Sequence, residues 1–85
     1  APDIYMIPVQ SNVNIGLYEE AYAGFLAFRE VHKNFKLNSE QKMSFRKTLT
    51  DLKARGAEVL KEEQIKEIDQ FIKKYFSFRR YYSIY

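Results

Sequence analysis

The side chains that could take part in catalysis are few in this sequence, and their spacing matches no catalytic pattern. The chain has no cysteine and one histidine, His32, which excludes thiolate chemistry and multi-histidine metal sites. No serine stands in a nucleophile-elbow sequence, and the glycines at positions 16, 24 and 56 are too scattered for a phosphate-binding loop. Carboxylates such as Glu63 and Glu67 lie among lysines on an outward face, without the desolvation that tunes a general acid. We therefore expect a protein that is not an enzyme and that uses no metal or other cofactor.

The C-terminal segment combines aromatic rings with cations and is the strongest binding feature of the sequence. From Lys73 onward it holds four cations and no acid. If the last helix continues to the end of the chain, its rings fall within an arc of about 120°, with Arg79 beside the arc and Arg80 opposite it. Tyr, Phe and Arg are the usual anchors of protein interfaces. With Arg29, which can stack on tyrosines or pair with a partner carboxylate, the candidate partner-binding residues are Tyr75, Phe78, Arg79, Arg80, Tyr81, Tyr82, Tyr85 and Arg29.

Three interpretations of this aromatic and basic ridge stay open. Packing of the ridge back onto the first helix and binding of a protein partner are about equally favoured. Stacking on single-stranded nucleic acid ranks well behind them. The acids Glu62, Glu63, Glu67 and Asp69 dilute the positive field nearby, which is why nucleic acid is the least favoured partner.

His32 falls by helical angle within the apolar face of the first helix, near Phe25 and Phe28. Burial would lower the pKa of this histidine and an acidic partner would raise it, so a pH-sensitive contact is conceivable. We favour a histidine that is satisfied by hydrogen bonding at the edge of the core.

The length and the hydrophobic pattern predict one small all-α domain. The chain has 85 residues, of which 46% are hydrophobic and 29% are charged, a balance typical of globular proteins. Apolar residues at helical spacing predict helices over residues 14–35, 39–55 and 62–80, and Asn14 is a suitable N-cap for the first. We expect residues 14–85 to form a three-helix bundle, or a helical hairpin plus one helix. No apolar run reaches the roughly 18 residues that a membrane span needs.

Residues 1–13 are expected to form an extended N-terminal arm. Pro2 and Pro8 both interrupt helix. Such an arm either packs on its own domain, which we favour, or lies on a partner.

A short segment at residues 37–41 (LNSEQ) recurs at residues 60–64 (LKEEQ). Each copy predicts a helix start, with a leucine before the cap and a glutamine that can bond back to free amides. The repeat resembles the paired Leu-Thr-x-x-Gln motifs of the periplasmic Spy/CpxP family over about residues 35–76. The resemblance places Leu37, Gln41, Leu60 and Gln64 at the motif positions, while Asn38 and Lys61 replace the threonine.

The resemblance implies an all-helical exported protein, often a cradle-shaped dimer. Proteins of this family bind unfolded or envelope proteins without ATP, on a basic and apolar concave surface. The chain begins at Ala1, which is expected either after removal of a signal peptide or after trimming of a methionine. We therefore expect a periplasmic or secreted protein, with a cytoplasmic one as the alternative.

These observations favour a small helical protein that binds other proteins in a chaperone-like manner through an aromatic and basic surface. The basic and aromatic C-terminal end suggests acidic or apolar partners. One alternative is an accessory subunit, inhibitor or immunity protein that clasps one folded partner with the arm and the tail. Another is the binding of single-stranded nucleic acid. A C2 homodimer is also plausible, because the first helix carries more apolar surface than two thin helices can cover.

Overall fold

The computed structural model describes residues 2–76 of the chain and confirms the all-α class. Its elements are α1 (Asp3–Asn14), α2 (Tyr18–Val31), a 3₁₀ turn η1 (His32–Asn34), α3 (Ser39–Arg55) and α4 (Glu62–Tyr75). Residues 2–76 contain no β-strand. The bundle therefore has four α-helices, one more than the sequence predicted.

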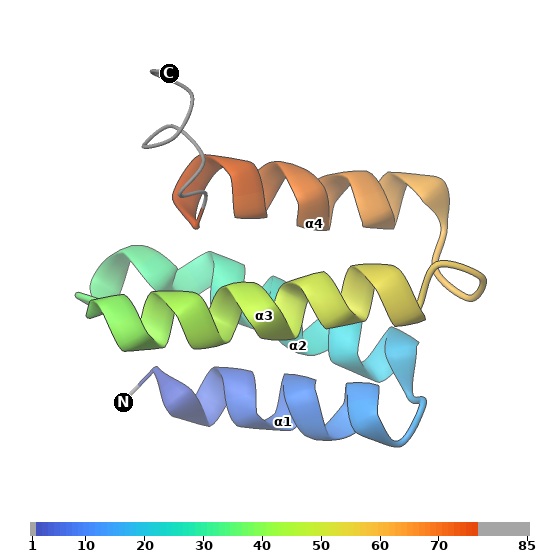
Figure 1. The fold of residues 1–85 in the computed structure, drawn as a ribbon, viewed down its shortest axis with the longest axis horizontal. Coiled ribbons are helices and arrows are strands. Elements are labelled where there is room, and N and C mark those ends of the chain that lie inside the picture. The colour runs from blue at the N-terminus through green and yellow to red at the C-terminus, as the bar shows by residue number, and fades with distance from the viewer. Residues whose placement is uncertain (1, 77–85) are drawn as a thin grey trace.

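The four helices run alternately up and down (Figure 1). Helices α1 and α3 point one way and α2 and α4 point the other, and α3 lies between α1 and α4 in this view. Side-chain bonds connect the helices in pairs: Thr48 on α3 donates to Gln10 on α1, and Lys53 on α3 donates to Asp69 on α4. At one end of the bundle lie the start of α1, the end of α2, the start of α3 and the end of α4.

A single apolar core joins all four helices. Its buried side chains are Met6, Val9, Val13, Ala21, Tyr22, Phe25, Phe28, Phe45, Leu49, Leu52, Leu60, Ile68, Phe71, Ile72 and Phe76. Phe28 of α2 is fully buried. Its ring centroid lies 6.4 Å from that of Tyr5 on α1, 5.4 Å from that of Phe45 on α3 and 6.2 Å from that of Phe71 on α4. One ring thus contacts each of the other three helices.

The expectation of an extended arm over residues 1–13 is wrong, because α1 occupies most of this segment. Pro8 lies inside the helix, and a proline there costs roughly 3 kcal/mol through its missing N–H and its ring. Met6, Val9 and Val13 recur at helical spacing and are buried, two of them completely. Burying each such side chain contributes about 1.5–3 kcal/mol, so together they outweigh the cost of one proline. Pro8 itself is exposed, where its ring meets no packed neighbour.

The predicted helix over residues 14–35 is divided in the structure. Asn14 is the last residue of α1 rather than an N-cap. Gly16 has a φ of 84°, a left-handed conformation that glycine adopts without steric cost, and α2 starts two residues later. At the other end the α-helix stops at Val31 and a 3₁₀ turn follows.

The remaining two helices start where the sequence predicted. Helix α3 has the predicted boundaries. Helix α4 starts at Glu62 and ends at Tyr75, with Phe76 at its C-cap, so the continuous helix expected through residue 80 is wrong at residue 76. Residues 77–80 lie outside the described residues.

Both copies of the repeated segment form helix starts, as their sequences predict. At α3, Asn38 Oδ1 accepts the Gln41 N–H at 2.8 Å and Gln41 Oε1 accepts the Asn38 N–H at 3.0 Å. At α4, Gln64 Oε1 accepts the Lys61 N–H at 2.8 Å, but a lysine side chain has no acceptor for the return bond. The reciprocal pair is therefore complete only at α3. Leu60 is buried and Leu37 is half-buried against the core.

We predict different stabilities for alanine variants at the two helix starts. Asn38→Ala should lower the free energy of unfolding by about 1 kcal/mol, because it leaves the Gln41 amide without its cap. Lys61→Ala is the matched control and should change it by less than about 0.5 kcal/mol, since no side-chain cap is lost. Urea unfolding followed by circular dichroism measures both, and equal losses would contradict the capping argument.

The close contact between α1 and α2 gives a second prediction. A Cβ added to Gly24 would lie 2.8 Å from Val9 Cγ2. Glycine to alanine normally stabilises a helix by about 1 kcal/mol, but here we expect Gly24→Ala to destabilise the protein by about 1–3 kcal/mol. Val9→Ala removes the opposing methyls, so the double variant should be more stable than the sum of the two single effects. Purely additive effects in urea unfolding would mean that α1 does not pack against Gly24.

Candidate functional site

The candidate site lies at the end of the bundle where α2 and α4 finish and α3 begins. Its centre is a stack of three rings from η1 and α4. The ring centroid of His32 is 4.4 Å from that of Tyr75 and 4.9 Å from that of Phe71. Phe71 is buried and belongs to the core, whereas His32 and Tyr75 are half-buried. The stack therefore connects the core to the surface.

His32 is held in its neutral form by its surroundings. Burial lowers the pKa of His32 below its ordinary value of 6.5, and the positive charges of Lys33 and Lys74 lower it further. The imidazole is consequently uncharged at neutral pH. In this state it packs as an aromatic ring against Tyr75 and Phe71 rather than acting as a cation.

Arg29 already has an ion-pair partner within the chain. Its Nη1 donates to Glu67 Oε1 at 2.9 Å, and the hydroxyl of Tyr22 donates to the same oxygen at 3.0 Å. The Arg29 guanidinium also lies over the ring of Phe25, 5.6 Å from its centroid. These hydrogen bonds lower the pKa of the Glu67 carboxyl, while burial raises the pKa of the Tyr22 hydroxyl. Glu67 therefore engages one nitrogen of the guanidinium, and a partner carboxylate would compete with Glu67 for this group.

Two shallow hollows flank the stack of His32 and Tyr75, and both residues line each of them. The first has a volume of about 230 Å³ and is lined by Arg29, His32, Glu67, Gln70, Phe71, Lys74 and Tyr75. The second has a volume of about 360 Å³ and is lined by His32, Lys33, Phe35, Lys36, Leu37, Lys42, Tyr75 and Phe76. We call the two together the basic end.

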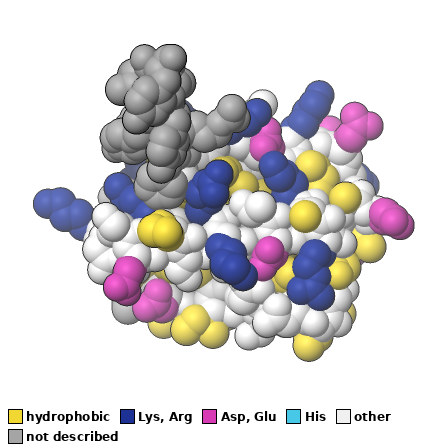
Figure 2. All heavy atoms as spheres, viewed as in Figure 1, with side chains coloured by type: hydrophobic (Ala, Val, Ile, Leu, Met, Phe, Trp, Pro, Cys, Tyr) yellow, Lys and Arg dark blue, Asp and Glu magenta, His cyan; other side chains and the backbone are white. Residues whose placement is uncertain are grey.

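Four lysines of the basic end are free of ion pairs within residues 2–76. The ion pairs of the described residues are Arg29–Glu67, Lys47–Asp51, Lys53–Asp69 and Lys73–Asp69. The remaining lysines of the two hollows, Lys33, Lys36, Lys42 and Lys74, are exposed. Figure 2 shows basic side chains at this end and across the visible face of α3. The basic end thus combines unpaired cations with an apolar and aromatic floor.

The structure brings together only part of the predicted partner-binding set. Arg29 and Tyr75 line the same hollow. The others, Phe78, Arg79, Arg80, Tyr81, Tyr82 and Tyr85, lie outside the described residues. Sequence reasoning missed Lys33, Lys36 and Lys42, although the positive sum of charges in the middle of the chain pointed to this region. The motif residues Leu60 and Gln64 stand at the start of α4, at the opposite end of the bundle from the ring stack.

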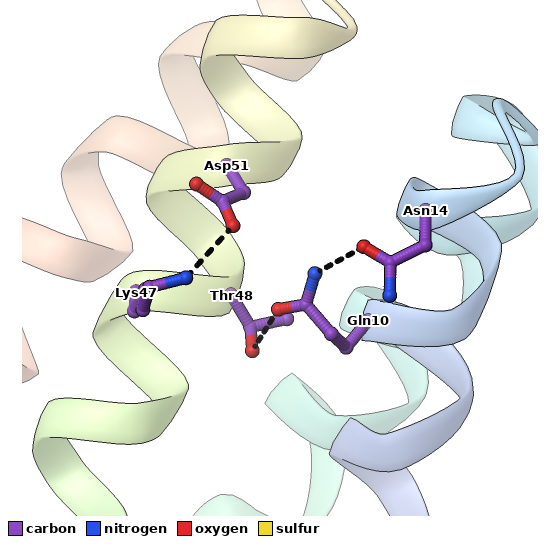
Figure 3. A network of polar contacts seen from close by, with 5 residues as sticks. All are labelled: Gln10, Asn14, Lys47, Thr48 and Asp51. Atoms are coloured by element: carbon purple, nitrogen blue, oxygen red, sulfur yellow. Dashed lines mark hydrogen bonds and ion pairs between the residues drawn. The ribbon is translucent and has the colours of Figure 1, made fainter.

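A second polar cluster lies between α1 and α3 and serves to join these helices (Figure 3). Gln10 Nε2 donates to Asn14 Oδ1 at 2.9 Å, and Gln10 Oε1 accepts from the buried hydroxyl of Thr48 at 2.8 Å. On α3, Lys47 Nζ pairs with Asp51 Oδ2 one helical turn away at 3.5 Å. These amides and hydroxyls satisfy one another, and this cluster offers no nucleophile with an adjacent base.

The described residues hold no group of three or more side chains that could bind a metal ion. Among the helices of residues 2–76, none has the length and apolar character to cross a membrane. Comparison of the chain with protein-family models, with curated proteins and with solved structures gave no match. The geometry of the basic end is therefore the main guide to function.

The neutral state of His32 leads to a prediction about pH. Because its pKa is lower in the folded protein than in the unfolded chain, the unfolded chain takes up the proton first as the pH falls. The free energy of unfolding should therefore decrease from about pH 6.5 downward until the folded pKa is passed. Glu67 and Asp69 also have lowered pKa values, but their contribution is lost only below about pH 4.5.

The variant His32→Phe keeps a ring in the stack and removes the titration. Urea unfolding between about pH 7.5 and pH 5 should show a falling stability for the wild type and a nearly constant one for this variant. His32→Gln removes both the ring and the titration. It should be less stable than His32→Phe at every pH, and its free energy of unfolding should be equally independent of pH. A slope that persists in both variants would assign the pH dependence to other groups.

Proposed function

We propose that this chain is a small helical protein that binds other proteins through the basic end, without ATP and in a chaperone-like manner. The observation that carries the proposal is the set of four lysines, free of ion pairs within the described residues, around a floor of aromatic and apolar side chains. Such a surface suits polypeptide segments that carry carboxylates next to apolar side chains, because both kinds of group find partners there.

The shape and charge of the basic end support a polypeptide over the other ligand classes. The hollows are shallow and open to solvent, whereas small-molecule sites are concave and enclose most of their ligand. Single-stranded nucleic acid requires ring faces on which bases can stack. The ring of Tyr75 is half-buried against His32 and Phe71, and Lys74 Nζ lies over its face at 5.4 Å from the centroid, so a base would have to displace this lysine to stack there. Nucleic acid nevertheless stays an outcome of the test below.

The resemblance to the Spy/CpxP family supports the chaperone-like form of the proposal and an exported location. Its motif residues start two helices here, and Leu37 also lines the basic end. The alternative of a subunit or inhibitor dedicated to one folded partner drew on a clasping arm at residues 1–13. That argument weakens because α1 is packed into the core.

The test uses the double variant Lys36→Glu and Lys42→Glu in the full chain. We measure the binding of a dye-labelled synthetic peptide of alternating Glu and Phe by fluorescence anisotropy. Each exposed ion pair contributes about 0.2–1 kcal/mol and each reversal adds repulsion, so the dissociation constant should rise about tenfold or more. Lys61→Glu with Lys66→Glu is the matched control and should bind as the wild type does. Lys61 at the N-cap of α4 and Lys66 on α4 are both exposed, and neither lines the hollows.

Three comparisons decide between the interpretations. A peptide of alternating Lys and Phe should bind much more weakly than the acidic peptide. A thymidine oligonucleotide that binds more tightly than the acidic peptide, with a steep loss of affinity in salt, would replace the proposal by nucleic-acid binding. No binding of the acidic peptide by the wild type, or equal losses in both double variants, would overturn the assignment of the basic end.

A further inference from the structure

The outer face of α1 carries few charges, because Asp3 at its start is the only charged residue of the helix. Residues 4–17 contain neither an acid nor a base, whereas residues 18–76 hold twelve Lys or Arg and ten Asp or Glu. Ile4, Ile7 and Ile15 are 66%, 63% and 69% exposed. Exposed apolar patches on the surface of a charged protein mark interaction sites.

The exposed residues form one stripe along the helix. At about 100° per residue, the side opposite the buried face holds Ile4, Ile7, Pro8 and Ser11. Ile15, the C-cap residue of α1, extends this side by one more exposed apolar side chain. The buried face, with Met6, Val9 and Val13, is already covered by the core of the protein. A helix that is apolar on both sides is normally covered on both sides. The stripe is therefore a candidate contact surface.

Charge argues against a membrane surface and against a charged partner as the occupant of the stripe. Helices that lie in the membrane interface carry Lys and Arg beside their apolar stripe, and α1 has no basic residue. The stripe residues themselves offer no opposite charge to a charged partner; the nearest charges are Asp3 and the residues of α3 across the neighbouring groove. An identical face meets neither difficulty.

We propose that the stripe is covered by a second copy of this chain, with the two α1 helices packed antiparallel about a two-fold axis. The chain carries a net charge of +3, so two copies repel each other over most of their surfaces. An uncharged face allows contact without that repulsion. Two-fold dimers also require one self-complementary patch.

The stripe is self-complementary when the two helices are antiparallel. In the register that sets Ile4 opposite the partner's Ile15, Pro8 stands opposite the partner's Ser11. Apolar side chains thus meet at both ends of the helix pair, and the smaller residues meet in its middle. The register uses the same residues on both copies, as a two-fold axis demands.

The position of the basic end also favours the antiparallel arrangement. The start of α1 lies at the same end of the bundle as the basic end (Figure 1). A parallel pair would place the lysines of both copies side by side, whereas an antiparallel pair places them at opposite ends of the dimer. Like charges at close range destabilise an interface.

The size of the face predicts a weak dimer. A helix of 12 residues is about 18 Å long. One face of so short a helix buries less area than the roughly 800 Å² per partner of a standard interface. A groove of about 640 Å³ between α1 and α3 borders the stripe and can receive side chains of the partner. Its lining includes the apolar Met6, Ile7 and Phe45 and the charged Asp3, Lys47, Asp51 and Arg55. We expect dissociation constants in the micromolar range.

Sedimentation velocity of the full chain between about 1 µM and about 1 mM tests the proposal. The wild type should change from monomer to dimer within this range. Ile4→Lys with Ile15→Lys places two lysines opposite each other at both ends of the helix pair, so this variant should stay monomeric. Ile4→Lys with Ile15→Glu should dimerise, because the antiparallel register pairs each lysine with a glutamate, whereas a parallel pair would oppose like charges.

Matched controls come from apolar side chains exposed elsewhere, Met43 on α3 and Val59 before α4. Met43→Lys and Val59→Lys should dimerise as the wild type does. A wild type that stays monomeric to about 1 mM, or dimerisation lost in both charge variants, would overturn the proposal. So would co-sedimentation of the wild type with neutral lipid vesicles that both charge variants abolish. Because Lys36→Glu with Lys42→Glu should still dimerise, failure here is distinguishable from failure of the proposed function.

Discussion

The contact on which this fold depends most is the ring of Phe28. It is fully buried, and it meets a ring on α1, on α3 and on α4 as well as the imidazole of η1. Aromatic pairs of this kind contribute about 0.5–1.5 kcal/mol each beyond the area they bury. In a domain of this size the total core is modest, so a side chain shared by every helix connects their positions. A shift of any one helix changes its contact with Phe28 and, through it, with the others.

The same aromatic contacts extend from the core to the basic end. Phe71 lies next to Phe28 and supports both His32 and Tyr75, which line both hollows. The floor of the candidate site is therefore the outer edge of the core, and the packing of the core sets its position. The lysines around it are exposed and long, so the charged part can adapt to different partners while the floor stays in place. This combination is appropriate for a surface that accepts many polypeptides.

Sequence reasoning succeeded where the determinants are local. The start of α3 follows from Asn38 and Gln41, three residues apart, and its prediction is confirmed. The sequence of residues 1–13 predicts an arm, because its two prolines disfavour a helix and its apolar pattern is short. The helix forms because other helices bury Met6, Val9 and Val13, and this burial is not visible in the local sequence. The pairing of Arg29 with Glu67 spans 38 residues. Lys33, Lys36 and Lys42 line one hollow because the chain turns at η1, between α2 and α3. Neither arrangement has a periodicity that a single sequence reveals.

The two surfaces of the molecule differ in a way that fits two kinds of partner. A charged surface selects partners and speeds their encounter, and it loses affinity in salt. An uncharged apolar stripe cannot select a partner by charge. It suits one constant partner, which in our proposal is a second copy of this chain. In the proposed antiparallel dimer the two basic ends face away from each other. A long unfolded polypeptide could then contact both ends at once, and the second contact would benefit from a high effective concentration. Two weak sites on a weak dimer can thereby hold an extended client more tightly than either site holds a short segment.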